Sequence, residues 1–404
     1  MFPRSSSSLL SASLVSLLAL TGCAATAPAE QAPDPGPDTH GAVDGAAELA
    51  EPALGLTSID QAGRVSHLDL FEETWADLGT ARVPSAVHSD GRYLFSIDES
   101  GVSVVDSGVW TWDHVDHFHY YRAQPRVIGD VVGGGVATVA TSNSSTSGGT
   151  GLFFPDTGDA VLLDTEALSK GRIEESFRLS REPGRGMVVP VGSFAAVAAA
   201  SGVTLHAADG AARGDSAECV DPAGTITTRV GAVIGCQDGA LLIHVEDDEP
   251  VIERIAYPAD APAPPATEFA NREGRPRVAA LAGGVGIWML DTRARSWTFL
   301  PAPEPLVQVV AVDDADGNVL ALTAEGRVLV LDGETGAPRA ASAPLVPASL
   351  ASGASPSLEV DQQRAYLNGP VEQRLWEIDF ADDARIAREF APQGTPLFFA
   401  ETGR

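Results

Sequence analysis

Short apolar segments that alternate with turns containing Gly or Asp dominate most of the chain. One unit recurs, made of a strand of small apolar residues, a turn, a second strand and often a final Asp. The seven copies of this unit are Arg92–Asp106, Gly151–Asp164, Phe194–Gly210, Gly231–Asp248, Arg277–Asp291, Asn318–Asp332 and Arg364–Asp379. Their turns follow one another at intervals of roughly 40–50 residues, with one longer interval that contains the Ser/Gly-rich stretch Thr141–Thr150. We interpret that stretch as an inserted loop.

A repeat of this length, built from short alternating strands, is typical of β-propellers, since it accommodates four strands and their turns. We therefore predict an all-β fold, a β-propeller of seven blades, over residues 54–404. The segments Leu54–Pro84 and Arg385–Phe399 flank the seven copies, and we expect them to share a closing blade that removes open sheet edges. A pair of β-sandwiches is the alternative architecture.

The N-terminal 53 residues do not follow this pattern. Residues 1–22 read as an export signal, because Arg4 precedes an apolar run, Leu9–Leu20, that is too short to span a bilayer. The run ends in Leu-Thr-Gly-Cys23, which resembles the bacterial lipobox and implies lipidation of Cys23. An ordinary signal peptide with a chance Cys is the alternative. Residues 23–53 are rich in Ala, Pro, Asp, Glu and Gly, so we expect a flexible tether there.

Charge and cysteine content limit the partners and the kinds of site that the protein can have. The formal net charge is -29, so we expect no nucleic-acid partner, because binding nucleic acid requires basic patches. Besides Cys23, the chain contains Cys219 and Cys236, both within one repeat. An exported protein matures in an oxidising compartment, so we expect these two to form a disulfide between neighbouring strands of a blade. A pair of thiolate metal ligands is the alternative.

The candidate chemistry is concentrated in the segment Asp113–Tyr121, where three of the eight histidines fall within six residues. Imidazole suits Zn²⁺, and carboxylates complete or orient such sites. In a strand, His117 and His119 would point to the same face, whereas His114 has the opposite parity and requires a loop or bulge. Asp116 or Asp113 could ligate or hold an imidazole. We predict a zinc site at this segment; a polar, aromatic-flanked surface strand is the alternative.

His88 is a further candidate ligand. It lies near the start of the first repeat, where it could face the propeller channel and join the site. The predicted metal residues are therefore His114, Asp116, His117, His119 and His88, and we predict no catalytic residues.

The segment 108–121, GVWTWDHVDHFHYY, followed by Arg122 and Pro125, resembles the AztD-type periplasmic zinc metallochaperones. The resemblance extends over most of the mature chain and implies a β-propeller that passes Zn²⁺ to the solute-binding protein of a zinc ABC importer. Carried over position by position, it implies His114, Asp116, His117 and His119 as zinc-site residues. One departure is evident: family members often have His-Gly-Glu after the first Cys of the pair, where this chain has Asp221–Thr225 without a His.

Three functions are compatible with these observations. The first, which we favour, is a monomeric, extracytoplasmic zinc metallochaperone that is attached to the cell membrane through Cys23 and is not an enzyme. The second is a metal-dependent propeller hydrolase or lyase. The third is a propeller scaffold that binds a protein or an envelope polymer.

Overall fold

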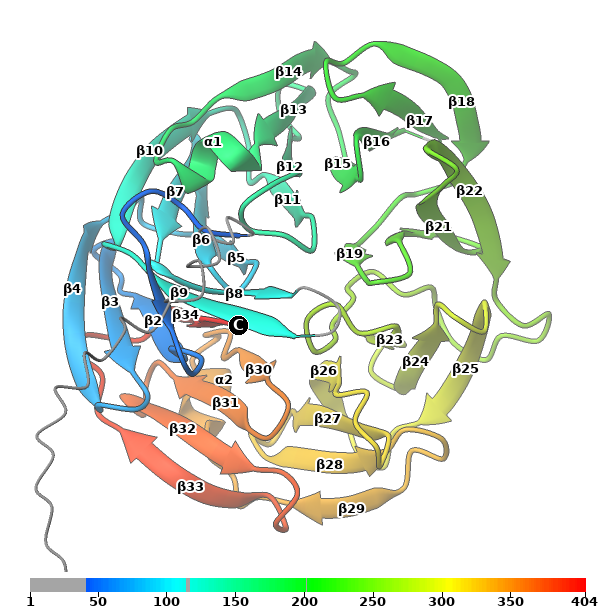
Figure 1. The fold of residues 1–404 in the computed structure, drawn as a ribbon. Helices are drawn as coiled ribbons and strands as arrows, with labels where there is room; N and C mark the ends of the chain where they lie inside the picture. The colour runs from blue at the N-terminus through cyan, green and yellow to red at the C-terminus, as the bar shows by residue number, and fades with distance from the viewer. Residues whose placement is uncertain (1–40, 114–116, 201) are drawn as a thin grey trace, which may run out of the picture. The chain divides into compact units, whose positions relative to one another are not determined.

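The computed structural model describes residues 41–113, 117–200 and 202–404. Within residues 39–404, eight antiparallel sheets follow one another in a ring, and each runs from an inner strand near the axis to an outer strand at the rim (Figure 1). We number the sheets as blades 1 to 8. The described residues contain only two short helices, α1 (Thr165–Ser169) and α2 (Pro347–Ala351). The prediction of an all-β propeller is therefore confirmed.

The first four blades each contain four strands, named in order from the axis to the rim. Blade 1 has β34 (Phe398–Thr402), β2 (Gly55–Ile59), β3 (Arg64–Asp69) and β4 (Thr74–Thr80). Blade 2 has β5 (Ala86–Ser89), β6 (Tyr93–Asp98), β7 (Gly101–Asp106) and β10 (Arg126–Val132). Blade 3 has β11 (Thr138–Thr141), β12 (Gly149–Phe154), β13 (Asp159–Asp164) and β14 (Glu175–Ser180). Blade 4 has β15 (Gly186–Val191), β16 (Phe194–Ala199), β17 (Gly202–Ala207) and β18 (Ala212–Glu218).

The other four blades continue in the same order around the ring. Blade 5 has β19 (Thr225–Thr227), β20 (Ala232–Cys236), β21 (Gly239–Glu246) and β22 (Glu249–Ala256). Blade 6 has β23 (Arg277–Leu281), β24 (Gly286–Asp291) and β25 (Ser296–Pro301), and a bridge between Ala270 and Ala279 extends it toward the axis. Blade 7 has β26 (Leu306–Ala311), β27 (Asn318–Thr323), β28 (Val328–Asp332) and β29 (Pro338–Ala341). Blade 8 has β30 (Leu358–Val360), β31 (Ala365–Gly369), β32 (Arg374–Asp379) and β33 (Arg385–Phe390).

The blade number differs from the predicted seven. Each of the seven sequence repeats forms the central hairpin of one blade, from β6–β7 in blade 2 to β31–β32 in blade 8. The eighth sheet, blade 1, combines both ends of the domain: β2 pairs antiparallel with β34, from Gly55 opposite Thr402 to Ile59 opposite Phe398. The expectation of a closing blade shared by the two ends of the domain was right, and that blade is the one the repeat count omitted. The C-terminal segment was placed too early, because Arg385–Phe390 forms β33 of blade 8 and the closing strand β34 begins at Phe398.

The hydrophobic core lies between the faces of adjacent blades. One cluster joins Leu320 and Val330 of blade 7 to Leu367 and Trp376 of blade 8. The strands that contribute to such clusters are buried on both faces, which explains their nearly continuous apolar sequences. Contact between blades 3 and 4 is especially close, since a Cβ on Gly151 would lie 1.8 Å from the carbonyl oxygen of Val188.

A separate three-stranded sheet stands apart from the eight blades. The hairpin of β8 (Val109–Asp113) and β9 (Phe118–Arg122) is inserted between the third and fourth strands of blade 2, and β1 (Ala47–Leu49) pairs with β9. Figure 1 shows the hairpin lying across the centre of the ring. The Thr111 hydroxyl donates to the Gly403 carbonyl at 2.7 Å, and Asp113 forms an ion pair with Arg229, which follows β19 of blade 5. The hairpin is thus fixed both at the middle of β8 and at its far end.

Strand β1 falls within residues 23–53, which the sequence assigned to a flexible tether. Its pairing with β9 uses backbone groups and needs few apolar side chains, so composition alone did not reveal it. The signal segment 1–22 and Cys23 lie outside the described residues. In the part of the chain that the structure describes, no helix is long and apolar enough to cross a membrane.

Cys219 and Cys236 form the predicted disulfide. Its position differs from the expectation of neighbouring strands in one blade. Cys219 follows β18 at the rim of blade 4, and Cys236 ends β20 of blade 5. The chain between them runs from the rim of one blade to the axis of the next, so the bond joins two consecutive blades.

Candidate metal centre

The β8–β9 hairpin places its aromatic and imidazole rings in a cross-strand cluster. In the antiparallel register, Trp110 lies opposite Tyr121 and Trp112 opposite His119. Alternation along each strand gives these four side chains a common face. The ring centroids of Trp110 and Tyr121 are 5.3 Å apart, and those of His119 and Tyr121 are 6.2 Å apart and nearly parallel. The aromatic residues that flank the histidines in sequence therefore form a packed support for His119.

His117 and His119 come together at the exposed end of this cluster. Their Nε2 atoms are 2.9 Å apart, and their ring centroids are 4.7 Å apart. Two nitrogens bound at 2.0–2.1 Å to one tetrahedral Zn²⁺ are separated by about 3.3 Å, so a small opening of the pair would admit the ion. The residues present therefore fit zinc as two of its ligands, and the prediction that these side chains share a face is confirmed.

Glu48 on β1 contacts one member of this pair, His119. Its Oε1 lies 2.7 Å from Nδ1 of His119, on the opposite side of the ring from the Nε2 that faces His117. The His119 side chain is 13 % exposed and that of Glu48 is 56 % exposed. Sequence reasoning missed Glu48 because it lies 71 residues before His119, within the segment assigned to the tether. Only the β1–β9 pairing identifies it.

A buried ion pair supports the base of the hairpin. The Arg92 guanidinium donates to both carboxylate oxygens of Asp106, each at 2.9 Å, and both side chains are fully buried. The same guanidinium lies 3.7 Å from the ring centroid of Trp110. A column of contacts thus runs from Arg92 through Trp110 and Tyr121 to His119, which links the core of blade 2 to the candidate ligands.

The other predicted ligands have different positions. His114 and Asp116 lie outside the described residues. Asp113 forms the ion pair with Arg229 described above. His88 is on β5, the inner strand of blade 2, where its Nε2 is 3.5 Å from the Thr141 hydroxyl and its ring packs on Phe95. Burial lowers the pKa of His88 to about 4, so its imidazole is neutral near pH 7. Among the described residues, no group of three His, Cys, Asp or Glu side chains is arranged to hold a metal.

An acidic network lies near the axis of the ring. Arg404 forms ion pairs with Glu401 at 3.1 Å, Glu359 at 3.2 Å and Glu273 at 3.5 Å. Burial raises the pKa of Glu273 to about 7 and that of Glu401 well above its ordinary value, against the opposing effect of Arg404. Through Arg404, this network joins blade 1 to blade 8 and to the segment before β23.

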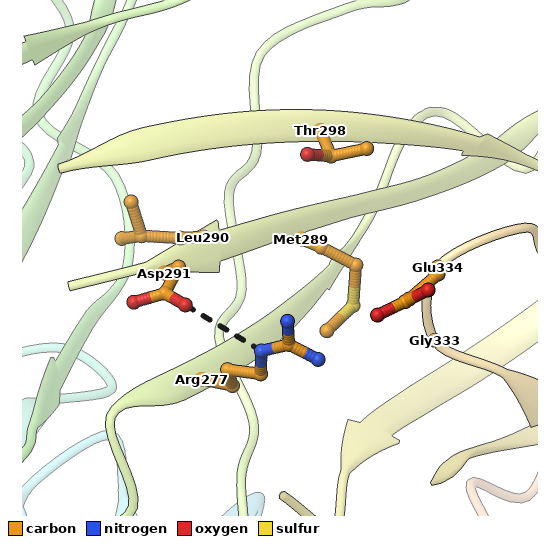
Figure 2. A pocket seen from close by; sticks show the side chains of 7 residues that line it. All are labelled: Arg277, Met289, Leu290, Asp291, Thr298, Gly333 and Glu334. Carbon is orange, nitrogen blue, oxygen red and sulfur yellow. Dashed lines mark hydrogen bonds and ion pairs between the residues drawn. The ribbon is translucent and has the colours of Figure 1, made fainter. Parts of the chain in front are cut away.

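Two surface pockets are distinct from the histidine pair. One, of about 150 Å³, lies between blades 6 and 7. Figure 2 shows its lining, where Arg277 and Asp291 form an ion pair beside Met289 and Glu334. The other, of about 410 Å³, is lined by residues of blades 3 and 4 and of the segments that precede β19 and β23, among them Arg185 and Glu268. Neither lining contains a His or Cys, so neither resembles a zinc site.

No family model and no curated protein matches the chain. Among solved structures, it is similar to AztD from Citrobacter koseri, with a TM-score of 0.74 and 19 % identity over 88 % of this chain and 99 % of that one. A structure of apo AztD from the same organism has a TM-score of 0.74 and 18 % identity, over 87 % of this chain and 98 % of that one. The dihydro-heme d1 dehydrogenase NirN has a TM-score of 0.55 and 14 % identity, over 87 % of this chain and 76 % of that one. The resemblance seen in the sequence is thus confirmed at the level of fold: this chain has the AztD-type β-propeller fold.

Proposed function

We propose that this protein is a zinc metallochaperone that captures Zn²⁺ between His117 and His119 and delivers it to the solute-binding protein of a zinc ABC importer. The observation that carries the proposal is the approach of two imidazole Nε2 atoms to 2.9 Å at the exposed end of the hairpin. The AztD-type fold supports it, since the sequence resemblance implies zinc transfer for that family.

The remaining coordination comes from nearby residues in this proposal. Zinc in proteins is usually tetrahedral, with four protein ligands in structural sites and three in catalytic sites. We propose that His114 and Asp116, which lie within three residues of His117 in the sequence, supply the further ligands, with His88 as the alternative donor. The place of this site at the exposed end of the hairpin suits a carrier, because a partner's ligand can approach the ion and replace one of the protein's ligands.

The test is a competition between the purified protein and a chromogenic zinc chelator. The variant His114→Ala/His117→Ala/His119→Ala is compared with the wild type and with His244→Ala, a control in which a partly buried His of blade 5 is removed. We expect tight zinc binding in the wild type and the control, and its loss in the triple variant. Binding that does not depend on the three histidines would overturn the proposed site.

Delivery and location require separate experiments. We propose that the mature protein is monomeric, lies outside the cytoplasm and is attached to the cell membrane through a lipid on Cys23, so Cys23→Ser should release it from the membrane fraction. Direct delivery predicts that an apo solute-binding protein takes zinc from the carrier faster than zinc dissociates into a chelator. Equal rates would argue for simple release. We propose a carrier and not an enzyme, and turnover of a test ester or lactone would contradict that.

A further inference from the structure

Strand β1 forms part of a strap, residues 41–49, that lies against the hairpin at the histidine pair. The indole Nε1 of Trp110 donates to the Gly41 carbonyl at 3.0 Å, and Gly41 packs so closely on Trp112 that a Cβ there would lie 2.3 Å from the ring. At the other end of the strap, β1 pairs with β9, and Glu48 lies opposite Tyr121. The strap therefore carries the Glu48 carboxylate to His119 from an otherwise distant part of the chain.

The contact with Glu48 determines which nitrogen of His119 carries hydrogen. A carboxylate only accepts hydrogen bonds, so the 2.7 Å contact requires a hydrogen on Nδ1 of His119. A neutral imidazole with hydrogen on Nδ1 has its lone pair on Nε2. That Nε2 faces the Nε2 of His117 at 2.9 Å, so with a neutral His119 the hydrogen between the two atoms comes from His117. The Nε2 of His119 is thus prepared to bind a cation that replaces this hydrogen.

We infer that Glu48 is the positioning residue of the zinc site: it fixes the tautomer and orientation of His119 without binding the metal itself. The inference rests on the proposed function and deepens it. Histidines that bind metal commonly donate their other ring N–H to a carboxylate, and removal of such a partner lowers metal affinity 10–100-fold. Because coupling between binding events is reciprocal, zinc also stabilises the strap on the hairpin.

The first measurement is the tautomer of His119 in the metal-free protein, read from the ¹⁵N shifts of its two ring nitrogens. We expect hydrogen on Nδ1 in the wild type and a mixture of tautomers in Glu48→Ala. Glu48→Gln should give a tautomer population between these two, since its amide oxygen accepts this hydrogen bond whereas its NH₂ group donates to the other tautomer. An unchanged tautomer in Glu48→Ala would overturn the inference whether or not the protein binds zinc.

The second measurement is zinc affinity, by chelator competition, for the same variants. The matched control is Glu51→Gln, which removes the same charge from an exposed residue of the adjoining segment. We expect a 10–100-fold loss in Glu48→Ala, a smaller loss in Glu48→Gln and none in Glu51→Gln. A Glu48→Ala affinity equal to that of Glu51→Gln would overturn the inference. Equal losses in Glu48→Ala and Glu48→Gln would also overturn it, because they would show that zinc binding depends on the charge of Glu48 and not on the hydrogen bond that it accepts.

The two proposals fail in distinguishable ways. If the wild type binds no zinc while the His119 tautomer responds to Glu48→Ala, then Glu48 positions His119 and the carrier function is wrong. If the three histidines are required for zinc binding while both Glu48 variants bind like the wild type, then the carrier function holds and the role of Glu48 is wrong.

Discussion

The ion pair between Arg92 and Asp106 offers a direct test of how the hairpin is supported. Asp106→Asn would leave the guanidinium buried without its carboxylate, while the shape of the site changes little. Both side chains are fully buried, and two hydrogen bonds of 2.9 Å connect them. Removing one partner of a buried pair typically costs about 3–5 kcal/mol, because the remaining charge is neither solvated nor neutralised. We expect Asp106→Asn to lower the free energy of unfolding by that amount.

The chain contains a matched control for this experiment. Arg277 and Asp291 are the first and last residues of their own repeat, as Arg92 and Asp106 are of theirs. They also form an ion pair, but at 3.5 Å and with side chains 35 % and 30 % exposed (Figure 2). Because solvent screens such pairs, Asp291→Asn should cost no more than about 1 kcal/mol.

Urea unfolding, followed by tryptophan fluorescence and circular dichroism, gives the free energy of unfolding of Asp106→Asn and of Asp291→Asn. The double variant Arg92→Met/Asp106→Leu provides a further check, because replacing a buried pair with apolar side chains is often neutral. We expect the double variant to be more stable than Asp106→Asn alone. Equal costs for Asp106→Asn and Asp291→Asn, or a double variant less stable than the single one, would refute the argument from burial.

Three further predictions concern the propeller itself. Reduction of the bond between Cys219 and Cys236, or its removal by Cys→Ser changes, should lower the free energy of unfolding by about 3 kcal/mol, measured in urea with and without a reductant, because the bond closes a 17-residue loop. Burial, assisted by nearby Arg122, lowers the pKa of His67 to about 4, so the unfolded chain binds an extra proton between about pH 6.5 and 4. Stability should therefore be full above pH 6.5 and fall by about 3 kcal/mol as the pH drops to 4, and a His67→Gln variant that kept this slope would contradict the assignment. Gly151→Ala should destabilise the contact between blades 3 and 4 by about 1–3 kcal/mol or more, whereas Gly202→Ala, whose new Cβ would meet a carbonyl oxygen at 3.5 Å, should show no comparable clash in the same unfolding assay.

The sequence predicted the propeller because most blades carry their own copy of one pattern. The repeat count gave one blade too few because blade 1 takes β2 and β34 from opposite ends of the domain. No single segment of the sequence therefore contains the repeat of that blade. The repeat pattern also does not show which of two equivalent ion pairs is buried and which is exposed. The pairs Arg92–Asp106 and Arg277–Asp291 occupy the same repeat positions, but only the first lies beneath the inserted hairpin.

The candidate site, like the fold, was predicted only in part from the sequence. Parity along a strand was enough to bring His117 and His119 together, because that relation is local. Glu48 could not be predicted, since its partner is set by backbone pairing between segments far apart in the chain. The geometry of His114 and Asp116 remains a prediction from the sequence.

The pairing of β34 with β2 has a consequence for how the chain folds. The hydroxyls of Thr57 and Thr402 meet at 3.0 Å across 345 residues. Joining points so far apart in a flexible chain costs about 5 kcal/mol of loop entropy, unless the intervening blades have already formed and brought them close. Assembly should thus proceed around the circle and finish with this strand, which leaves the inner edge of β2 unpaired until β34 has been synthesised. During that interval the nascent protein presents a bare strand to its surroundings, so its yield in the cell should depend on whatever shields that edge from other chains.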